Sequence, residues 1–276
     1  MARTRFRRPQ RNGPGLLFIL VALVVVAAAG ARFMGLTPRA TFEPISTTTN
    51  VVRQEIPAPQ VIVEQPASSG TIVLYHAHST ENYSPNPTHA RDGNVGDIGK
   101  VAQKLKAALE AKGYTVDYHA DNFDVPDFSG AFGAAATKLS RVVQSDSVVA
   151  VVDIHRDGLP KSREEGYTTA NINGTPTAKL LFVAGDVSNP NLQANVEIAQ
   201  AMKDYLDKAY SGIMRGIKVQ HRNLNGNLHP NTLTVYIGDY HGNSLAEAEA
   251  AVEPLAEALD AVLSEAQPTL APVVTP

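Results

Sequence analysis

The chain has 276 residues and carries 24 Lys and Arg against 27 Asp and Glu, with no Cys and no Trp. Seven of the basic residues and none of the acidic ones fall within residues 1–39, which leaves 17 bases against 27 acids in the rest, a net charge near −10. This acidic body excludes a broad basic surface for nucleic acid, which needs clustered Lys and Arg. Without cysteine, disulfides, cysteine zinc ligands and a cysteine nucleophile are excluded, so any metal site must use His and carboxylates.

The first expected element is a membrane span. A basic tail at residues 1–15 precedes an apolar segment at residues 16–36, whose uninterrupted part would extend about 24 Å as a helix. A cleaved signal peptide is one alternative, because small residues at 27–31 offer a cleavage site, and a buried core helix is another. We expect an uncleaved signal-anchor, since Arg32 interrupts the cleavage region. The arginines then stay in the cytoplasm, which predicts a single-pass protein of the cell membrane with its domain on the extracytoplasmic side.

Two segments flank the expected domain, which spans residues 70–266. Residues 37–69 contain five prolines and a run of three threonines, a composition typical of an extended stalk. Residues 267–276 contain three prolines and are predicted to be disordered. A domain of about 200 residues is long enough to bury one sizeable core.

Within this domain, apolar runs of strand length alternate with helical patterns. Strands are expected at residues 71–77, 114–119, 147–155, 179–184, 216–220 and 233–238. Helices are expected at residues 100–112, 134–143, 191–210 and 244–266, the last of them kinked or broken near Pro254. The alternation predicts an α/β fold, a single domain with a mostly parallel sheet flanked by helices. Ligands in such folds bind at the carboxyl ends of the strands.

Two of the expected strands end in side chains that can bind a metal. His76, His78 and Glu81 lie at the close of the first strand as an H-x-H-x-x-E pattern, in which an extended segment would place both histidines on one side. Asp153 and His155 share a face near the end of the third strand. A lone histidine at a strand end is usually structural, but these residues converge on neighbouring strand ends. They can supply the three N/O ligands of a catalytic zinc site and a carboxylate that orients one imidazole.

Five motifs occur in order along residues 70–260. They are Tyr75-His-Ala-His-Ser-Thr-Glu-Asn-Tyr83, Asp153-Ile-His-Arg-Asp157, the strand at 179–185 with Asn189-Pro-Asn191 after it, Gly212-Ile-Met-Arg-Gly-Ile217, and Gly242-Asn-Ser-Leu-Ala-Glu247 preceded by Gly238. In this order and spacing the sequence resembles the stage II sporulation protein P family of N-acetylmuramoyl-L-alanine amidases. The predicted anchor and Pro/Thr-rich stalk are also similar to that family.

The resemblance implies a zinc-dependent hydrolase that cuts the amide between the lactyl group of N-acetylmuramic acid and L-alanine, with peptidoglycan as its ligand. By matched positions it implies His78, Glu81 and His155 as zinc ligands, with His76 as an alternate ligand or a support for one. Arg156 either faces the substrate or developing oxyanion, or pairs with the aspartate that follows it. The family also implies wall remodelling during sporulation and engulfment, with the stage II proteins D and M as partners.

One position departs from the family pattern. Where the family has a Glu that acts as general base or acid, in the strand before the last helix, this chain has Tyr236. A phenol with an unperturbed pKa of about 10 is a poor base at neutral pH, although its O–H can donate to an oxyanion. Asp239 is the candidate substitute if its loop folds inward. The alternative function is therefore a degenerate amidase that binds peptidoglycan or acts as a scaffold. A phosphoesterase on the same fold is a weaker alternative, because two-metal phosphoesterases usually need more ligating carboxylates than this sequence offers.

Overall fold

The computed structural model of the protein describes residues 69–91, 93–164 and 166–266. The predicted basic tail, membrane span and C-terminal disordered tail lie outside these residues, as does all of the predicted stalk except its last residue. In the part of the chain that is described, none of the helices combines the length and hydropathy that crossing a bilayer requires.

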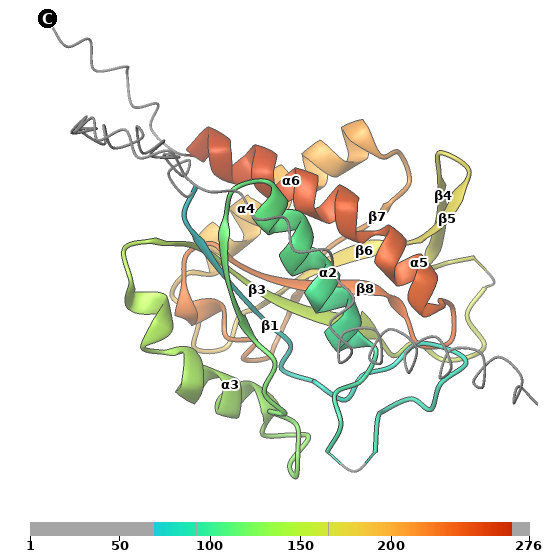
Figure 1. Ribbon diagram of the computed structural model, residues 1–276, viewed down its shortest axis with the longest axis horizontal. Helices are drawn as coiled ribbons and strands as arrows, with labels where there is room; N and C mark the ends of the chain where they lie inside the picture. Colours follow the sequence, from blue (N-terminus) through green and yellow to red (C-terminus); the bar gives the residue numbers. More distant parts are fainter. Residues whose placement is uncertain (1–68, 92, 165, 267–276) are drawn as a thin grey trace, which may run out of the picture. The chain divides into compact units, whose positions relative to one another are not determined.

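A six-stranded sheet runs through the described residues in the order β2-β1-β3-β8-β6-β7 (Figure 1). Strands β2, β1, β3 and β8 are parallel, whereas β6 pairs antiparallel with β8 and parallel with β7. The starts of β6 and β7 therefore lie at the sheet edge where β3 and β8 end. The strands are β1 (Thr71–Tyr75), β2 (Thr115–His119), β3 (Val148–Asp157), β6 (Leu180–Gly185), β7 (Met214–Gln220) and β8 (Thr232–Asp239).

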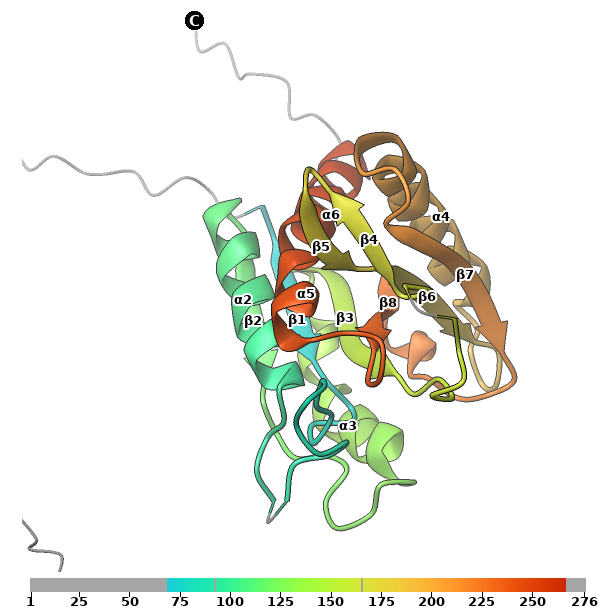
Figure 2. The ribbon, with the colours of Figure 1, turned by 90° about the vertical axis from the view of Figure 1, so that its right-hand side faces the viewer.

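Helices cover the two faces of this sheet unequally, as Figure 2 shows. The larger apolar cluster joins one face of the sheet to four helices, and a smaller cluster joins the other face to one helix. The four are α2 (Ile98–Ala111), α4 (Leu192–Ala209), α5 (Leu245–Ala250) and α6 (Val252–Ala266), and the single one is α3 (Ala131–Leu139).

Strand alternation divides the core between the two faces. Leu74 and Ile154 point into the larger cluster, while Val73 and Val151 point into the smaller one. All four side chains are fully buried, and each contributes about 1.5–3 kcal/mol through removal of its apolar surface from water. Because β1 and β3 are buried on both faces, their ends are rigid platforms for the residues that follow.

The predicted α/β class and the predicted elements are confirmed, with local differences at element ends. The helix predicted at 134–143 starts earlier and ends at Leu139, followed by the 3-10 turn η1 (Val142–Gln144). The last helix is divided at Ala251, and Pro254 lies in the first turn of α6, where its missing N–H breaks no helical hydrogen bond.

The sequence analysis missed a hairpin of β4 (Thr169–Ile172) and β5 (Thr175–Ala178), which pair antiparallel. Asn173 and Gly174 form its turn, and both have positive φ, 51° and 85°. Asn-Gly is the preferred pair for such a two-residue turn. A second 3-10 turn, η2 (Gly226–Leu228), precedes β8.

Candidate metal centre

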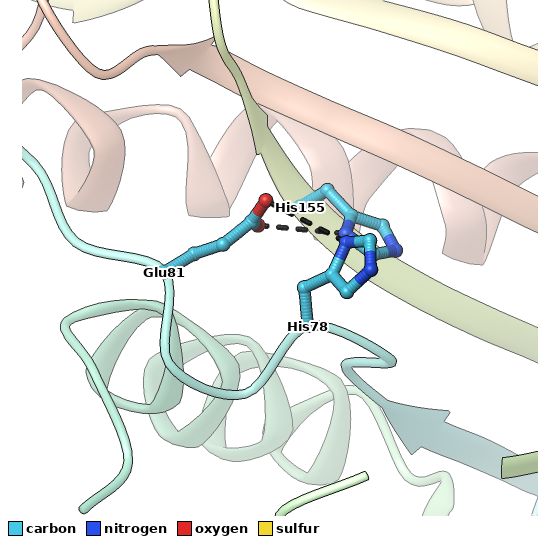
Figure 3. A group of neighbouring side chains, drawn as sticks. All are labelled: His78, Glu81 and His155. Atoms are coloured by element: carbon cyan, nitrogen blue, oxygen red, sulfur yellow. Dashed lines mark ion pairs between the residues drawn. The ribbon is translucent and has the colours of Figure 1, made fainter. Parts of the chain in front are cut away.

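His78, Glu81 and His155 form one group where β1 and β3 end (Figure 3). His78 and Glu81 lie in the loop that follows β1, and His155 lies near the end of β3. One ligand atom from each residue can be chosen so that all three lie within 4.8 Å of one another. Glu81 Oε2 is 3.4 Å from Nδ1 of His155, and Glu81 Oε1 is 3.9 Å from Nδ1 of His78. The predicted trio is thus brought together by the fold.

The loop that carries two of these residues is fixed by Asp124. Asp124 accepts hydrogen bonds from the hydroxyls of Ser79 and Thr80 and from the backbone N–H of Thr80. Burial raises the pKa of Asp124, but these hydrogen bonds outweigh it and hold the pKa below its ordinary value. Gly96 packs against the same loop so closely that a Cβ there would lie 2.2 Å from the Glu81 carbonyl oxygen. The loop therefore has little freedom to move its side chains away from β3.

His155 lies between two carboxylates. Its Nε2 is 2.9 Å from Oδ1 of Asp153, and its Nδ1 faces Glu81. Burial lowers the pKa of His155, but the two carboxylates outweigh it and raise the pKa to about 10. Burial raises the pKa of Glu81, and His155 and Arg156 reverse this, so that it falls below its ordinary value. The negative charge of the carboxylates attracts a cation to this point, either a proton or a metal ion.

The donor set fits zinc. Two imidazoles and one carboxylate are the three N/O ligands typical of a catalytic zinc site, which keeps a fourth position open. Asp153 takes the place of the carboxylate that orients a ligating imidazole, and it is fixed in turn by the backbone N–H of Ala77, 3.0 Å away. His78, Glu81 and His155 would therefore hold the metal with Asp153 behind them.

His76 is not brought to this group. β1 ends at Tyr75, so the strand alternation that would have placed His76 beside His78 does not continue. Nε2 of His76 lies 2.8 Å from the hydroxyl of Tyr118 on β2, whose ring packs against the larger cluster. Burial lowers the pKa of His76, so the ring is neutral at neutral pH. His76 is therefore a buried core residue. Three residues, His78, Glu81 and His155, remain around the candidate metal position.

Arg156 lies behind Glu81. Its backbone N–H donates to Glu81 Oε2 at 3.0 Å, and its Nη1 is 3.4 Å from Glu81 Oε1. Its guanidinium also donates to the carbonyl oxygens of Asn82 and Thr88 in the same loop. The alternative ion pair with Asp157 is not formed, because Asp157 pairs with Arg215 at 2.8 Å. Arg156 thus orients Glu81 and holds the loop.

Tyr236 occupies the position beside the candidate metal. It is the register partner of His155 in the β3–β8 pair, and the two ring centroids are 5.5 Å apart. Burial, together with the charges of Glu81 and Asp153, raises the pKa of Tyr236 further above its ordinary value. The phenol therefore stays protonated at neutral pH and can act as a hydrogen-bond donor.

Both carboxylate oxygens of Asp239 accept backbone hydrogen bonds in place of a contact with the candidate metal group. Its Oδ1 accepts from the backbone N–H of Leu159 at 2.7 Å, and its Oδ2 accepts from those of His241 and Gly242 at 3.0 and 2.9 Å. These hydrogen bonds fold the loop after β8 around the carboxylate. Asp239 therefore organises that loop at the end of β8, three residues beyond Tyr236.

An aromatic wall beside the group was not predicted. The ring of Phe128 stacks on His78 with centroids 4.0 Å apart and an interplanar angle of 6°, and Phe132 lies 5.7 Å from His155. Phe128 is 47% exposed. Both rings line a cavity of about 470 Å³ together with His78, Ser129, Gly133, Arg222, Asn223 and Leu224. Phe128 lies in a loop and Phe132 in the first turn of α3, so the two rings belong to no shared periodic pattern that would have indicated this wall.

A family model, stage II sporulation protein P (SpoIIP), matches residues 40–260 of the chain. Among solved structures, the N-acetylmuramoyl-L-alanine amidase AmiC2 of Nostoc punctiforme is similar with a TM-score of 0.46 and 15% identity, over 72% of this chain and 97% of that one. The CwlD amidase of Clostridioides difficile, solved in complex with the GerS lipoprotein, has a TM-score of 0.45 and 14% identity over 71% and 97%. Comparison with curated proteins finds no match.

Proposed function

Since the chain belongs to the stage II sporulation protein P family, we propose that it is a peptidoglycan hydrolase, a zinc-dependent N-acetylmuramoyl-L-alanine amidase that cuts the lactyl–L-alanine amide. The observation that carries this proposal is the convergence of His78, Glu81 and His155 at the ends of β1 and β3. These are the residues that the family motifs select, and they form a donor set suited to zinc.

Within this proposal, each nearby residue has a separate task. Zinc, when bound, polarises the scissile carbonyl and lowers the pKa of water. Asp153 orients the His155 ring, and Arg156 orients Glu81. Tyr236 holds its proton and can donate it as a hydrogen bond to the oxygen on which negative charge develops. The stacked ring of Phe128 excludes water from one side of His78.

A second candidate function is favoured by the missing general base. The position of the family's Glu carries Tyr236, and the neighbouring Asp239 is occupied by three backbone N–H groups. A protein with this arrangement can keep its zinc and its affinity for peptidoglycan while it acts as a binding or scaffolding component. The two functions share the same site and differ in turnover.

The proposal includes the setting in which the domain works. A basic tail followed by an apolar segment supports a single membrane anchor, with the domain on the extracytoplasmic side. Family membership supports wall remodelling in sporulation and engulfment, with the stage II proteins D and M as partners.

The test measures zinc content and turnover separately. The full-length chain, His155→Ala and His221→Ala are purified, bound zinc is measured by elemental analysis, and release of stem peptides from purified peptidoglycan is followed. We expect zinc and release in the natural chain, loss of both in His155→Ala, and retention of both in His221→Ala, whose side chain is exposed and pairs with Asp186. Zinc and peptidoglycan binding without release would select the scaffold. A natural chain without zinc would contradict the metal site.

A further inference from the structure

A second polar cavity lies on the other side of Tyr236 from the aromatic wall. It has a volume of about 240 Å³, and Tyr236 and Leu181 contribute to its floor from β8 and β6. Arg215, from the motif at residues 212–217, lines this cavity. It has no part in the proposed zinc chemistry. The remaining lining residues are Asp157, Leu159, Arg163, Tyr167, Arg215, Lys218 and Gln220.

A β-bulge places Arg215 at this cavity. Leu180 pairs with Met214 and Leu181 pairs with Gly216, so Arg215 is the extra residue on β7. Gly216 has φ of +126°, a conformation that side-chain-bearing residues rarely adopt. A bulge of this kind redirects a side chain out of the strand alternation.

The guanidinium of Arg215 is held in place but only partly satisfied. Its side chain is 8% exposed, and its Nη2 donates to Asp157 Oδ2 at 2.8 Å. Its Nε and Nη1 are buried and have no hydrogen-bond partner among the described residues. Buried N–H groups in proteins are nearly always paired, and a guanidinium is best paired with a carboxylate or phosphate. Two such donors without an acceptor among the described residues can bind a carboxylate of a ligand.

Charge around the cavity favours an anion. Arg163 and Lys218 join Arg215, and the single acid on the wall, Asp157, offsets one of the three cations. Tyr167 lies against two of them, with its ring centroid 4.7 Å from Cζ of Arg163 and 5.3 Å from Cζ of Arg215. This positive cluster stands out because residues 40–276 carry a net charge near −10. Like charges gathered at one place repel one another, and a ligand of opposite charge relieves that repulsion.

We propose that this cavity is a subsite for a carboxylate of the bound stem peptide. The inference rests on the proposed function, because it takes the ligand to be peptidoglycan. Tyr236 lies beside His155 and also lines the cavity, so it joins the two sites. A ligand with its scissile carbonyl at the metal centre extends across Tyr236 and places a carboxylate against Arg215. Arg215 and Lys218 are then specificity residues, whereas His78, Glu81 and His155 carry the reaction centre.

The experiment uses two ligands that differ only in charge. They are N-acetylmuramoyl-L-alanyl-γ-D-glutamyl-L-lysine and the same compound with both peptide carboxylates converted to carboxamides. Binding to the full-length chain is measured by calorimetry in the presence of a chelator, so that no turnover occurs. We expect the carboxylate form to bind about tenfold more tightly, the difference that a charge-assisted hydrogen bond supplies, with a preference that weakens as salt is added.

Three variants assign this preference to the cavity. Arg215→Gln and Lys218→Gln are expected to reduce it to about twofold or less, while Lys203→Gln, on the surface of α4 and paired with Asp207, keeps it. Lys218 is exposed, so its substitution tests the subsite even if Arg215→Gln impairs folding. Equal affinity for the two ligands, or an unchanged preference in Lys218→Gln, overturns the subsite and leaves the amidase proposal intact. Failure of the natural chain to bind either ligand overturns both.

Discussion

Tyr236 faces His155 across the β3–β8 pair, with their ring centroids 5.5 Å apart. The two residues are register partners, so the backbone hydrogen bonds of the sheet fix their proximity. Any side chain at position 236 therefore lies next to the candidate metal. The chemical character of this one side chain decides whether the site contains a base.

Substitution of Tyr236 by Glu tests this dependence. We expect Tyr236→Glu to increase stem-peptide release by about 10²-fold, because a carboxylate at this place can accept a proton and a protonated phenol cannot. The measurement is the rate of release from purified peptidoglycan, with zinc content as a check on the site. Tyr236→Phe is the control for the hydroxyl, and its rate should fall about tenfold if the O–H donates to the developing oxyanion. A Tyr236→Glu variant slower than the natural chain would show that the phenol is the functional group.

His76 should contribute to stability and not to metal binding. We expect His76→Gln to retain zinc and to lower the free energy of unfolding by about 1–3 kcal/mol, since the fully buried His76 ring and its hydrogen bond to the partly buried Tyr118 hydroxyl are lost. Urea unfolding and elemental analysis measure the two properties on the same preparation. Tyr118→Phe removes the other half of the contact and should destabilise the chain without loss of zinc. Zinc loss in His76→Gln would return His76 to the ligand set.

Asp124 should make the stability of the domain depend on pH. Its pKa is lower in the folded chain than in the unfolded chain, where it is about 3.9, because Ser79 and Thr80 donate to the ionised form. Its contribution is fully present above that unfolded value and is lost as the pH falls through the folded one. We expect the unfolding free energy of Asp124→Asn to be lower near neutral pH and to fall less steeply between about pH 5 and about pH 3. Asp146→Asn, at an exposed position, should follow the natural curve.

The metal trio could be predicted because it depends on strand ends. Parallel neighbouring strands end at the same edge, so His78, Glu81 and His155 had to approach one another once β1 and β3 were identified. The interpretation of His76 depended on two residues of strand length, because a strand that continued from Tyr75 through residue 77 would have kept His76 beside His78. Strand boundaries are the least certain part of a sequence pattern, and side chains change face at every residue.

Other parts of the site depend on long-range arrangement. The local sequence of residues 179–184 does not indicate that β6 runs antiparallel to β8. The bulge at Arg215 is defined only by the pairing of β7 with β6. The hydrogen bonds of Arg156 to Asn82 and Thr88 likewise arise from loop packing. By contrast, the turn of the β4–β5 hairpin was present in the sequence as Asn173-Gly174 and could have been recognised.

The unequal covering of the sheet has a steric consequence. α3 packs beneath β1 and β3, whereas Leu181 and Lys218, on the same side of β6 and β7, line an open cavity. A strand of polymer that continues in both directions cannot be threaded into a closed tunnel, but it can be laid sideways on an exposed surface. Under the proposed function, entry from the side over β6 and β7 requires no free chain end of the peptidoglycan network.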